Sequence, residues 1–331
     1  METKIFRGYH RELANRFVSD LNLPIQNTDE DYFFSNLRLL EDKYSSMTKY
    51  RELCDLINER FNGDPNTFLS EYYQIRDNII TDILESDSYK RFNECDLSYY
   101  EVNRVLYNNV TSNNIYNKEN NCKTFVSIDL KKANFQALKY AGVINEETYE
   151  DFIGKYTDID YIKNSKYTRQ VIFGKLNPKR QITIEKYLIS LLYKGIIDSD
   201  EYKEIGNRLK LVSASNDELV FEVLGLSERP QIFNKIQKAL NDRYQYIGFS
   251  IQMFTLHALS LWSHNTRNKR QTMYAKVDSF TSKAELMCVP SYYFPLVYAS
   301  YYNIPLKEFM YHFTFEGMDC RICESFNLVI E

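Results

Sequence analysis

The sequence predicts an α+β protein in which a small antiparallel sheet is flanked by helices and preceded by a helical N-terminal region. The first hundred residues carry apolar side chains at the three- and four-residue spacing of amphipathic helices. Residues 124–130 are rich in β-branched and aromatic side chains, which favours a buried strand. Residues 211–223 contain two short strand patterns joined at Asn216 and Asp217, two residue types that tolerate tight turns.

Composition limits the class of protein. The chain has 331 residues, and 41 Lys and Arg against 45 Asp and Glu give a net charge of −4. A hydrophobic content of 44% excludes a disordered chain. The sequence has neither an apolar run long enough to span a bilayer nor the apolar core of a signal peptide, so we expect an intracellular protein with no membrane partner. The acidic balance argues against a nucleic-acid protein. Abundant Tyr, Lys, Asn and Ile are typical of AT-rich genomes, many of them viral.

The polar residues 107–121 separate a mainly helical region, residues 1–120, from a second region, residues 121–225, and a third α+β region covers residues 226–331. After the strand at 124–130, the spacing predicts helices at residues 131–142, 145–156, 164–176, 182–193 and 199–209, before the two strands of 211–223. The third region is predicted to form helices at 232–242 and 252–263, a strand at 274–279 and a short helix at 306–313.

The cysteines do not form a predicted disulfide framework. Only Cys320 and Cys323 have the spacing of metal ligands, with His312 nearby. A structural zinc site needs four ligands, and no second pair exists, so we interpret these residues as ordinary thiols.

Acidic side chains follow the predicted strands. Asp129 ends the first strand, and Asp217 and Glu218 lie at the tip of the strand pair. If these strands adjoin in one sheet, Asp129 and Asp217 would converge and could hold two Mg²⁺ ions, as metal-assisted nucleotidyl transfer requires. The alternative is structural: Asp129 would cap the next helix and Asp217 would form the turn.

A basic segment lies between the two carboxylates. On a helix, Lys166, Arg169 and Phe173 fall at i, i+3 and i+7 and share one face. Two cations beside an aromatic ring suit a triphosphate with a base stacked behind it. The alternative is a solvated basic face with Phe173 in the core.

Together these segments resemble the conserved motifs of the family A polymerases, the group of bacterial DNA polymerase I and the single-subunit phage RNA polymerases. Residues 217–223, Asp-Glu-Leu-Val-Phe-Glu-Val, are similar to motif C, with Asn216 in place of the usual His. Residues 129–136 have the layout of motif A. Arg169, Phe173 and Gly174 match motif B, and the order A, B, C is also the family's order.

The resemblance covers about a third of the chain and implies a polymerase-like palm, with residues 1–120 as a thumb-like or partner-binding region and residues 226–331 completing the palm or thumb. It assigns Asp129, Asp217 and the adjacent Leu130 to metal binding, with Glu218 supporting the catalytic pair. The nucleotide would contact Lys166, Arg169, Phe173, Gly174, Asn134, Asn177 and Gln136.

Three of these positions depart from the pattern of DNA polymerases. Asn134 and Asn177 occupy the places of the Glu and Tyr that exclude a ribose 2′-hydroxyl, and Gln136 matches the phage RNA polymerases. The exclusion of ribonucleotides is therefore left open by the sequence. Ser165 replaces a second motif B cation, and the spacing between motifs B and C is unusually short.

The leading expectation is a compact, template-directed DNA polymerase that uses two Mg²⁺ ions, or Mn²⁺, with nucleoside triphosphates and a primer–template or RNA. An accessory replication or transcription protein would strengthen its grip, and residues 179–180 and 267–270 would contact backbone phosphates. One alternative is RNA synthesis, priming or template-independent transfer on the same palm. The other is a non-catalytic replication or transcription scaffold.

Overall fold

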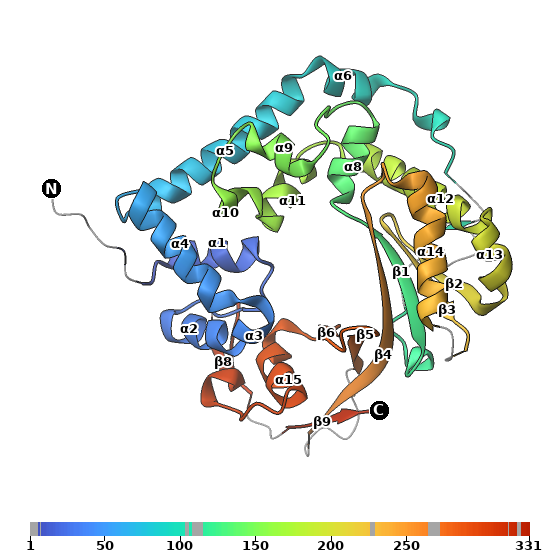
Figure 1. Cartoon of the computed structure of the whole chain (residues 1–331). Coiled ribbons are helices and arrows are strands. Elements are labelled where there is room, and N and C mark those ends of the chain that lie inside the picture. The colour runs from blue at the N-terminus through green and yellow to red at the C-terminus, as the bar shows by residue number, and fades with distance from the viewer. Residues whose placement is uncertain are drawn as a thin grey trace.

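The computed structural model describes residues 6, 8–102, 106–107, 115–225, 229–263, 272–316, 318–322 and 326–331. Figure 1 shows the elements arranged around a ring. N-terminal helices form one side, the sheet forms the other, and the C-terminal elements return beneath the first helices. Side-chain contacts close this ring: Gln26 Nε2 donates to Ser291 Oγ at 2.7 Å, and Lys43 Nζ donates to the Ala284 carbonyl at 2.9 Å.

The N-terminal region is helical, as its apolar spacing predicts. Its helices are α1 (Arg11–Asp20), α2 (Glu30–Leu39), α3 (Glu41–Tyr44), α4 (Ser46–Arg60), α5 (Pro65–Glu85) and α6 (Asp87–Glu94), followed by the short turns η1 (Leu97–Tyr99) and η2 (Lys118–Asn120). Asp64 caps α5 by accepting from the backbone N–H of Asn66, and Pro65 occupies the first turn, where its missing N–H is not needed. Asn62 and Gly63 take positive φ angles in the turn before it.

A seven-stranded antiparallel sheet carries the candidate site. Its order is β2 (Leu209–Ala214), β3 (Glu218–Val223), β1 (Thr124–Leu130), β4 (Phe249–Ser263), β5 (Thr272–Asp278) and β6 (Ala284–Met287), with β9 (Phe326–Ile330) also pairing with β4. The predicted hairpin at 211–223 is confirmed. The predicted small sheet is larger than expected, because β4, β5, β6 and β9 all come from the third region of the chain.

The segment between β1 and β2 is helical. It contains α8 (Ala133–Tyr140), α9 (Tyr149–Gly154), α10 (Asp160–Lys163), α11 (Lys166–Gly174), α12 (Pro178–Ile197), α13 (Asp200–Ile205) and the turn η3 (Gly206–Arg208), and α14 (Arg229–Tyr244) follows β3. The helix predicted at 145–156 is shorter, because it begins only after the Thr148 cap.

The two faces of the sheet differ in what covers them. Val126 and Ile128 of β1 lie on the face that packs against α12 and α14. Tyr193 of α12 stacks on Phe221 of β3 with ring centroids 6.4 Å apart. Because side chains alternate along a strand, Ser127 and Asp129 lie on the opposite face. Figure 1 shows α12 and α14 outside the sheet and α11 on its inner side.

One predicted helix is wrong. Residues 252–263 form most of the long strand β4, which pairs with β1, β5 and β9. Apolar side chains occur on both faces of this strand: Met253 packs in the main core, whereas Phe254 and Leu256 pack in a second cluster on the inner face. A strand buried on both faces loses the simple alternation that identifies it in a sequence.

The C-terminal elements are short. They are η4 (Ser291–Tyr293), α15 (Phe294–Tyr301), η5 (Glu308–Tyr311), β7 (His312–Phe315) and β8 (Met318–Arg321). The helix predicted at 306–313 is therefore only a single turn that leads into the β7–β8 hairpin. Among the described residues, no helix is long and apolar enough to cross a membrane.

Candidate active site

Asp129 and Asp217 come together at one corner of the sheet. β1 and β3 are antiparallel neighbours, with Asp129 directly opposite Glu218. The backbone N–H of Leu130 donates to the carbonyl of Asp217 at 2.8 Å. The end of β1 and the tip of the β2–β3 hairpin are thereby joined, as the sequence-based hypothesis of convergent carboxylates requires.

Local hydrogen bonds hold the hairpin tip. Ser215 Oγ accepts from the backbone N–H groups of Asp217 and Glu218 at 3.3 and 3.0 Å, and it lies 2.9 Å from Asp217 Oδ1, to which it donates. The serine therefore stabilises the turn, and the Asp217 side chain is exposed. Asp217 itself lies in the turn between β2 and β3, so the turn position that the structural alternative gives it is observed as well.

Asp129 does not cap the helix that follows it. α8 begins at Ala133, and its N-cap is Lys132, which has a left-handed backbone (φ 54°) and makes no side-chain cap. The Asp129 carboxylate is half-buried on the inner face of the sheet. It is therefore placed by the strand and left without the structural role that the alternative assigned to it.

Electrostatics identify this corner as a place of excess negative charge. Burial, and after it the charge of Asp217, raise the pKa of Asp129 to about 6 against the opposing charges of Lys276 and Lys166. Burial also raises the pKa of Glu218, whose side chain accepts a hydrogen bond from Ser127. Carboxyls perturbed by burial and by each other are typical of functional sites and would be relieved by a bound cation.

The predicted metal ligands fit a cation supported by few protein groups. Asp129 and Asp217 would supply two carboxylates, and Leu130, the last residue of β1, would supply a backbone carbonyl. Within the described ranges there is no group of three or more His, Cys, Asp or Glu side chains arranged to hold a metal. A Mg²⁺ ion that keeps several waters needs only one or two carboxylates together with substrate phosphates.

The predicted triphosphate-binding cations lie on α11. Lys166 is its first residue and is exposed, and its positive charge acts on Asp129. Arg169 is half-buried with its guanidinium 5.7 Å from the centre of the Tyr149 ring, and burial lowers its pKa. Lys132 forms an ion pair with Glu150 beside the same ring. Arg169 and Lys132 therefore meet at the Tyr149 ring, and Lys166 is the cation of α11 whose charge acts on Asp129.

A buried network fixes the N-terminus of α11. Asp20, which is only 1% exposed, accepts from the hydroxyls of Ser165 at 2.8 Å, Tyr72 at 2.6 Å and Tyr161 at 2.9 Å. Ser165 in turn accepts from the backbone N–H of Thr168 at 2.9 Å. The residues that flank Lys166 are therefore tied to α1 and α5.

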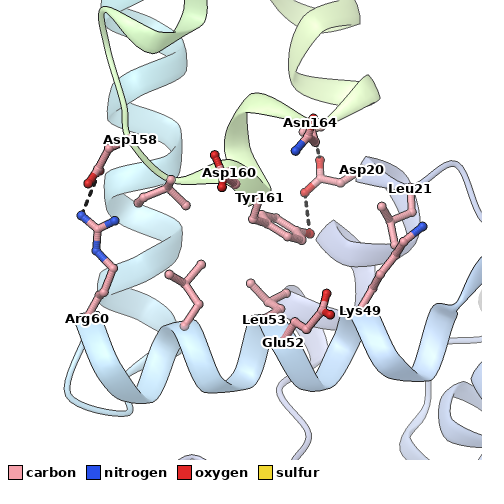
Figure 2. A pocket seen from close by; sticks show the side chains of 13 residues that line it. Asp20, Leu21, Lys49, Glu52, Leu53, Arg60, Asp158, Asp160, Tyr161 and Asn164 are labelled. Carbon is pink, nitrogen blue, oxygen red and sulfur yellow. Dashed lines mark hydrogen bonds and ion pairs between the residues drawn. The ribbon is translucent and has the colours of Figure 1, made fainter. Parts of the chain in front are cut away.

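Asp20 also borders a cavity of about 630 Å³. Figure 2 shows Asp20 and Tyr161 on one side of this cavity and Leu53 and Lys49 of α4 on the other, with the Arg60–Asp158 ion pair at one end. Asp129 and Asp217 are not among its lining residues. The cavity is thus separate from the candidate active site.

The stacking role predicted for Phe173 is not compatible with its position. Phe173 is fully buried and lies 6.3 Å from Tyr149 and 6.4 Å from Phe152, measured between ring centroids. A ring enclosed by other aromatic rings has no face open to a nucleotide, so the alternative of a core position is the one observed. Gly174 ends α11 and is exposed.

Asn177 has a structural role that the resemblance does not imply. Its side chain caps α12 by accepting from the backbone N–H of Arg180 at 3.4 Å, and its Nδ2 donates to Asn93 Oδ1 at 3.2 Å. Gln136 lies elsewhere, in a smaller cavity of about 270 Å³ with Lys139, Tyr140 and Tyr246. Among the hydrogen bonds of the described residues, none joins Asn177 or Gln136 to Asp129 or Asp217.

Asn134 forms a hydrogen bond with Glu185, a residue that the sequence analysis does not identify. Its Nδ2 donates to Glu185 Oε1 of α12 at 3.0 Å. Glu185 is only 4% exposed, and burial together with the charge of Asp217 raises its pKa to about 7. A signal for it exists in the sequence, because Glu185 lies three and seven residues before Leu188 and Leu192, on the apolar face of the helix.

Lys276 is a second residue near the candidate site that the sequence analysis does not identify. It lies on β5, where it pairs with Leu256 of β4. Asp129 pairs with Ser250 of the same strand. Because these two β4 residues are an even number of positions apart, Lys276 and Asp129 lie on the same inner face of the sheet. Its Nζ is 4.4 Å from the centre of the Phe254 ring, and its charge opposes the raised pKa values of Asp129 and Glu218.

Two other sequence-based interpretations lie partly outside the described residues. The basic run 267–270 and Cys323 are among the residues that the structure does not describe. Arg180, which belongs to the basic pair 179–180 that was predicted to contact backbone phosphates, donates a hydrogen bond to the carbonyl of Cys95. Cys320 is a free thiol.

Comparisons with known proteins add no family to these observations. No family model matches the chain, and a search of curated proteins finds no match.

Proposed function

We propose that the chain is a metal-dependent nucleotidyltransferase that adds nucleotides to a 3′-hydroxyl. The observation that carries the proposal is the convergence of Asp129 and Asp217 across the β1–β3 pair, joined through the Leu130–Asp217 hydrogen bond. The resemblance of the same residues to polymerase motifs A and C supports this assignment. The backbone geometry and the motif resemblance both support the same two carboxylates, those of Asp129 and Asp217.

The residues divide into those that hold metal and those that hold phosphate. Asp129 and Asp217 would bind two Mg²⁺ ions, with the Leu130 carbonyl as a further ligand and Glu218 behind them. When bound, the ions lower the pKa of the attacking hydroxyl and neutralise charge on the leaving group. Lys166 and Arg169 would bind the triphosphate and stabilise charge that develops on it. Lys276 would contact a backbone phosphate of the nucleic acid.

The reaction balances without another reactant. The oxygen of the 3′-hydroxyl forms a bond to the α-phosphorus, and the bond from that phosphorus to the bridging oxygen breaks. Pyrophosphate leaves with the electron pair, and the hydroxyl proton passes to solvent. The chain itself has to align these groups and stabilise the charge.

The sequence-based expectation is template-directed DNA synthesis. RNA synthesis or priming is the second candidate, and the hydrogen-bonded pair of Asn134 and Glu185 favours it. A non-catalytic scaffold is the third candidate. It does not account for an Asp129 carboxylate that is held half-buried on the inner face of the sheet, near the charge of Asp217, at an electrostatic cost.

A primer-extension assay tests the proposal. Labelled primer–template is incubated with the protein and Mg²⁺ or Mn²⁺, with either dNTPs or NTPs, and an EDTA reaction serves as the control. We expect metal-dependent extension that stops at the end of the template. Unprimed template and single strands test priming and tailing. If no nucleotide is transferred on any of these substrates with either metal, the proposal is wrong and the scaffold becomes the better account.

A further inference from the structure

The cavity of about 630 Å³ beside Asp20 takes no part in the proposed reaction. Its size falls within the range of about 300 to 1,000 Å³ that is usual for pockets that bind small molecules. One wall is α4, and the facing wall comes from residues 158–165, with the end of α1 beside them (Figure 2). The cavity therefore has room for a ligand of small-molecule size.

Hydrogen bonds and an ion pair hold the walls of this cavity in place. Tyr161 and Ser165 both donate from their hydroxyls to the buried carboxylate of Asp20, at 2.9 and 2.8 Å. At one end, Arg60 pairs with Asp158 at 2.9 Å, which joins α4 to the facing wall. Because these contacts are all between protein groups, a ligand does not have to order the walls when it binds.

Much of the lining is apolar. Leu53 of α4 and Ile159 of the facing wall are each only 1% exposed. Leu21 and Leu56 are half-buried and line the same cavity. Tyr161 lines it as well, and because its hydroxyl is already hydrogen-bonded, its ring is the part that it offers a ligand. An apolar group placed here would be removed from water on both sides.

Two opposite charges at this cavity have no ion-pair partner among the described residues. They are Lys49 and Glu52, exposed residues of α4 that lie at the end away from the Arg60–Asp158 pair (Figure 2). The other charged lining residues are paired: Asp20 with Arg16, Arg60 with Asp158 and Asp160 with Lys163. Lys49 and Glu52 are three positions apart and so lie on the same side of the helix. The cavity thus offers one cation and one anion next to apolar side chains.

We propose that this cavity binds a free α-amino acid with a large apolar side chain. Such a molecule carries an ammonium, a carboxylate and an apolar group on one carbon, and the cavity has a complement for each. Glu52 would accept from the ammonium, and Lys49 would donate to the carboxylate. The apolar side chain would lie against Leu53 and Ile159. Because four carboxylates line the cavity against two cations, the phosphates of a nucleotide would be repelled.

Three probes that share an indole ring separate these contributions. L-Tryptophan carries both charges, tryptamine carries only the ammonium, and indole-3-propionate carries only the carboxylate. Isothermal titration calorimetry with the full chain measures the Kd of each probe. We expect L-tryptophan to bind about 3- to 5-fold more tightly than either single-charge probe, because each missing contact is an ion pair at a solvent-exposed rim.

Two variants assign the charges to their residues. Glu52→Gln should weaken the binding of L-tryptophan and tryptamine, and it should not weaken that of indole-3-propionate. Lys49→Met should weaken the binding of L-tryptophan and indole-3-propionate, and it should not weaken that of tryptamine. The matched control is Glu59→Gln, which changes an exposed glutamate of α4 that does not line the cavity and should keep all three Kd values. Leu56→Trp fills the cavity and should weaken the binding of every probe.

Circular dichroism and thermal unfolding show whether each variant is folded, and Leu56→Phe replaces Leu56→Trp if the latter is not. Three results would overturn the inference: L-tryptophan that binds no more tightly than the single-charge probes, an unchanged Kd for L-tryptophan in the folded Glu52 and Lys49 variants, or no binding of any probe at millimolar concentration. The inference does not depend on the proposed function, because binding is measured without nucleotide or metal.

Discussion

The backbone N–H of Leu130 donates to the carbonyl of Asp217 at 2.8 Å, which ties the end of β1 to the tip of the β2–β3 hairpin. The two residues are 87 positions apart in the sequence, and this hydrogen bond brings the carboxylates of Asp129 and Asp217 to the same corner of the sheet. Several measurable properties depend on this placement.

Divalent cations should stabilise the folded protein through Asp217. Because the carboxylates are brought together only in the folded chain, Mg²⁺ binds that state preferentially and raises the free energy of unfolding, by about 2.7 kcal/mol at a 100-fold excess over Kd. Thermal unfolding with Mg²⁺ or EDTA measures this effect. We expect the shift to disappear in Asp217→Asn and to persist in the control Glu222→Gln, which changes a glutamate of β3 that pairs with Lys123 at 3.4 Å. An equal shift in both variants would place the cation elsewhere.

Without metal, the stability should depend on pH through Asp129. Its pKa of about 6 in the folded protein is above the ordinary value for an aspartate, so the folded state binds the proton more tightly. The resulting stabilisation is fully present below about pH 4 and is lost as the pH rises through 6. In EDTA, we expect the wild type to lose more stability between pH 4 and 7 than Asp129→Asn does. Parallel curves for the two proteins would contradict the assigned environment of Asp129.

Lys166 should act on the nucleotide and leave the fold unchanged. Its side chain is exposed at the start of α11 and its charge acts on Asp129, so Lys166→Met removes charge from the proposed triphosphate site. We expect KM for the nucleotide to rise by about 10- to 100-fold, as for the loss of a charged hydrogen bond. The control is Lys163→Met, because Lys163 pairs with Asp160 at 2.7 Å on α10. Equal effects of the two substitutions would argue against a specific contact.

Phe173 should affect stability and not nucleotide stacking. Its ring is fully buried beside Tyr149 and Phe152. Phe173→Ala should lower the free energy of unfolding by about 3 to 5 kcal/mol, as for large core truncations. Denaturant titration measures the loss, and Phe173→Leu should lose less. A variant with unchanged stability and a raised KM for the nucleotide would restore the stacking role.

The sequence predicts those parts of the site that depend on local patterns. Asp129 at the end of a β-branched strand and Asp217 in a hairpin could both be identified, because strand composition and turn residues are local signals. The partner of Asn134 could not, since Glu185 comes from a helix 51 residues away and only the packing of α12 on α8 brings the two together. The burial of Phe173 depends in the same way on α9.

The same limit explains the errors in the fold. β4 was predicted as a helix because apolar side chains on both faces conceal the alternation of a strand. Its identity depends on pairing with β1 and β5, and β5 brings Lys276 to the inner face. Long-range strand pairing, which the residue pattern does not encode locally, therefore decides both the size of the sheet and one of the cations near the site.

The most direct test of the account is single-nucleotide incorporation by the wild type, Asp129→Asn, Asp217→Asn and the Glu222→Gln control, each shown to be folded, on one primer–template with Mg²⁺. Because bound metal contributes several kcal/mol to stabilising the transition state, we expect each aspartate variant to lose at least about 100-fold in rate and the control to keep the wild-type rate. Wild-type rates in the folded aspartate variants would contradict the proposal that these two carboxylates form the active site.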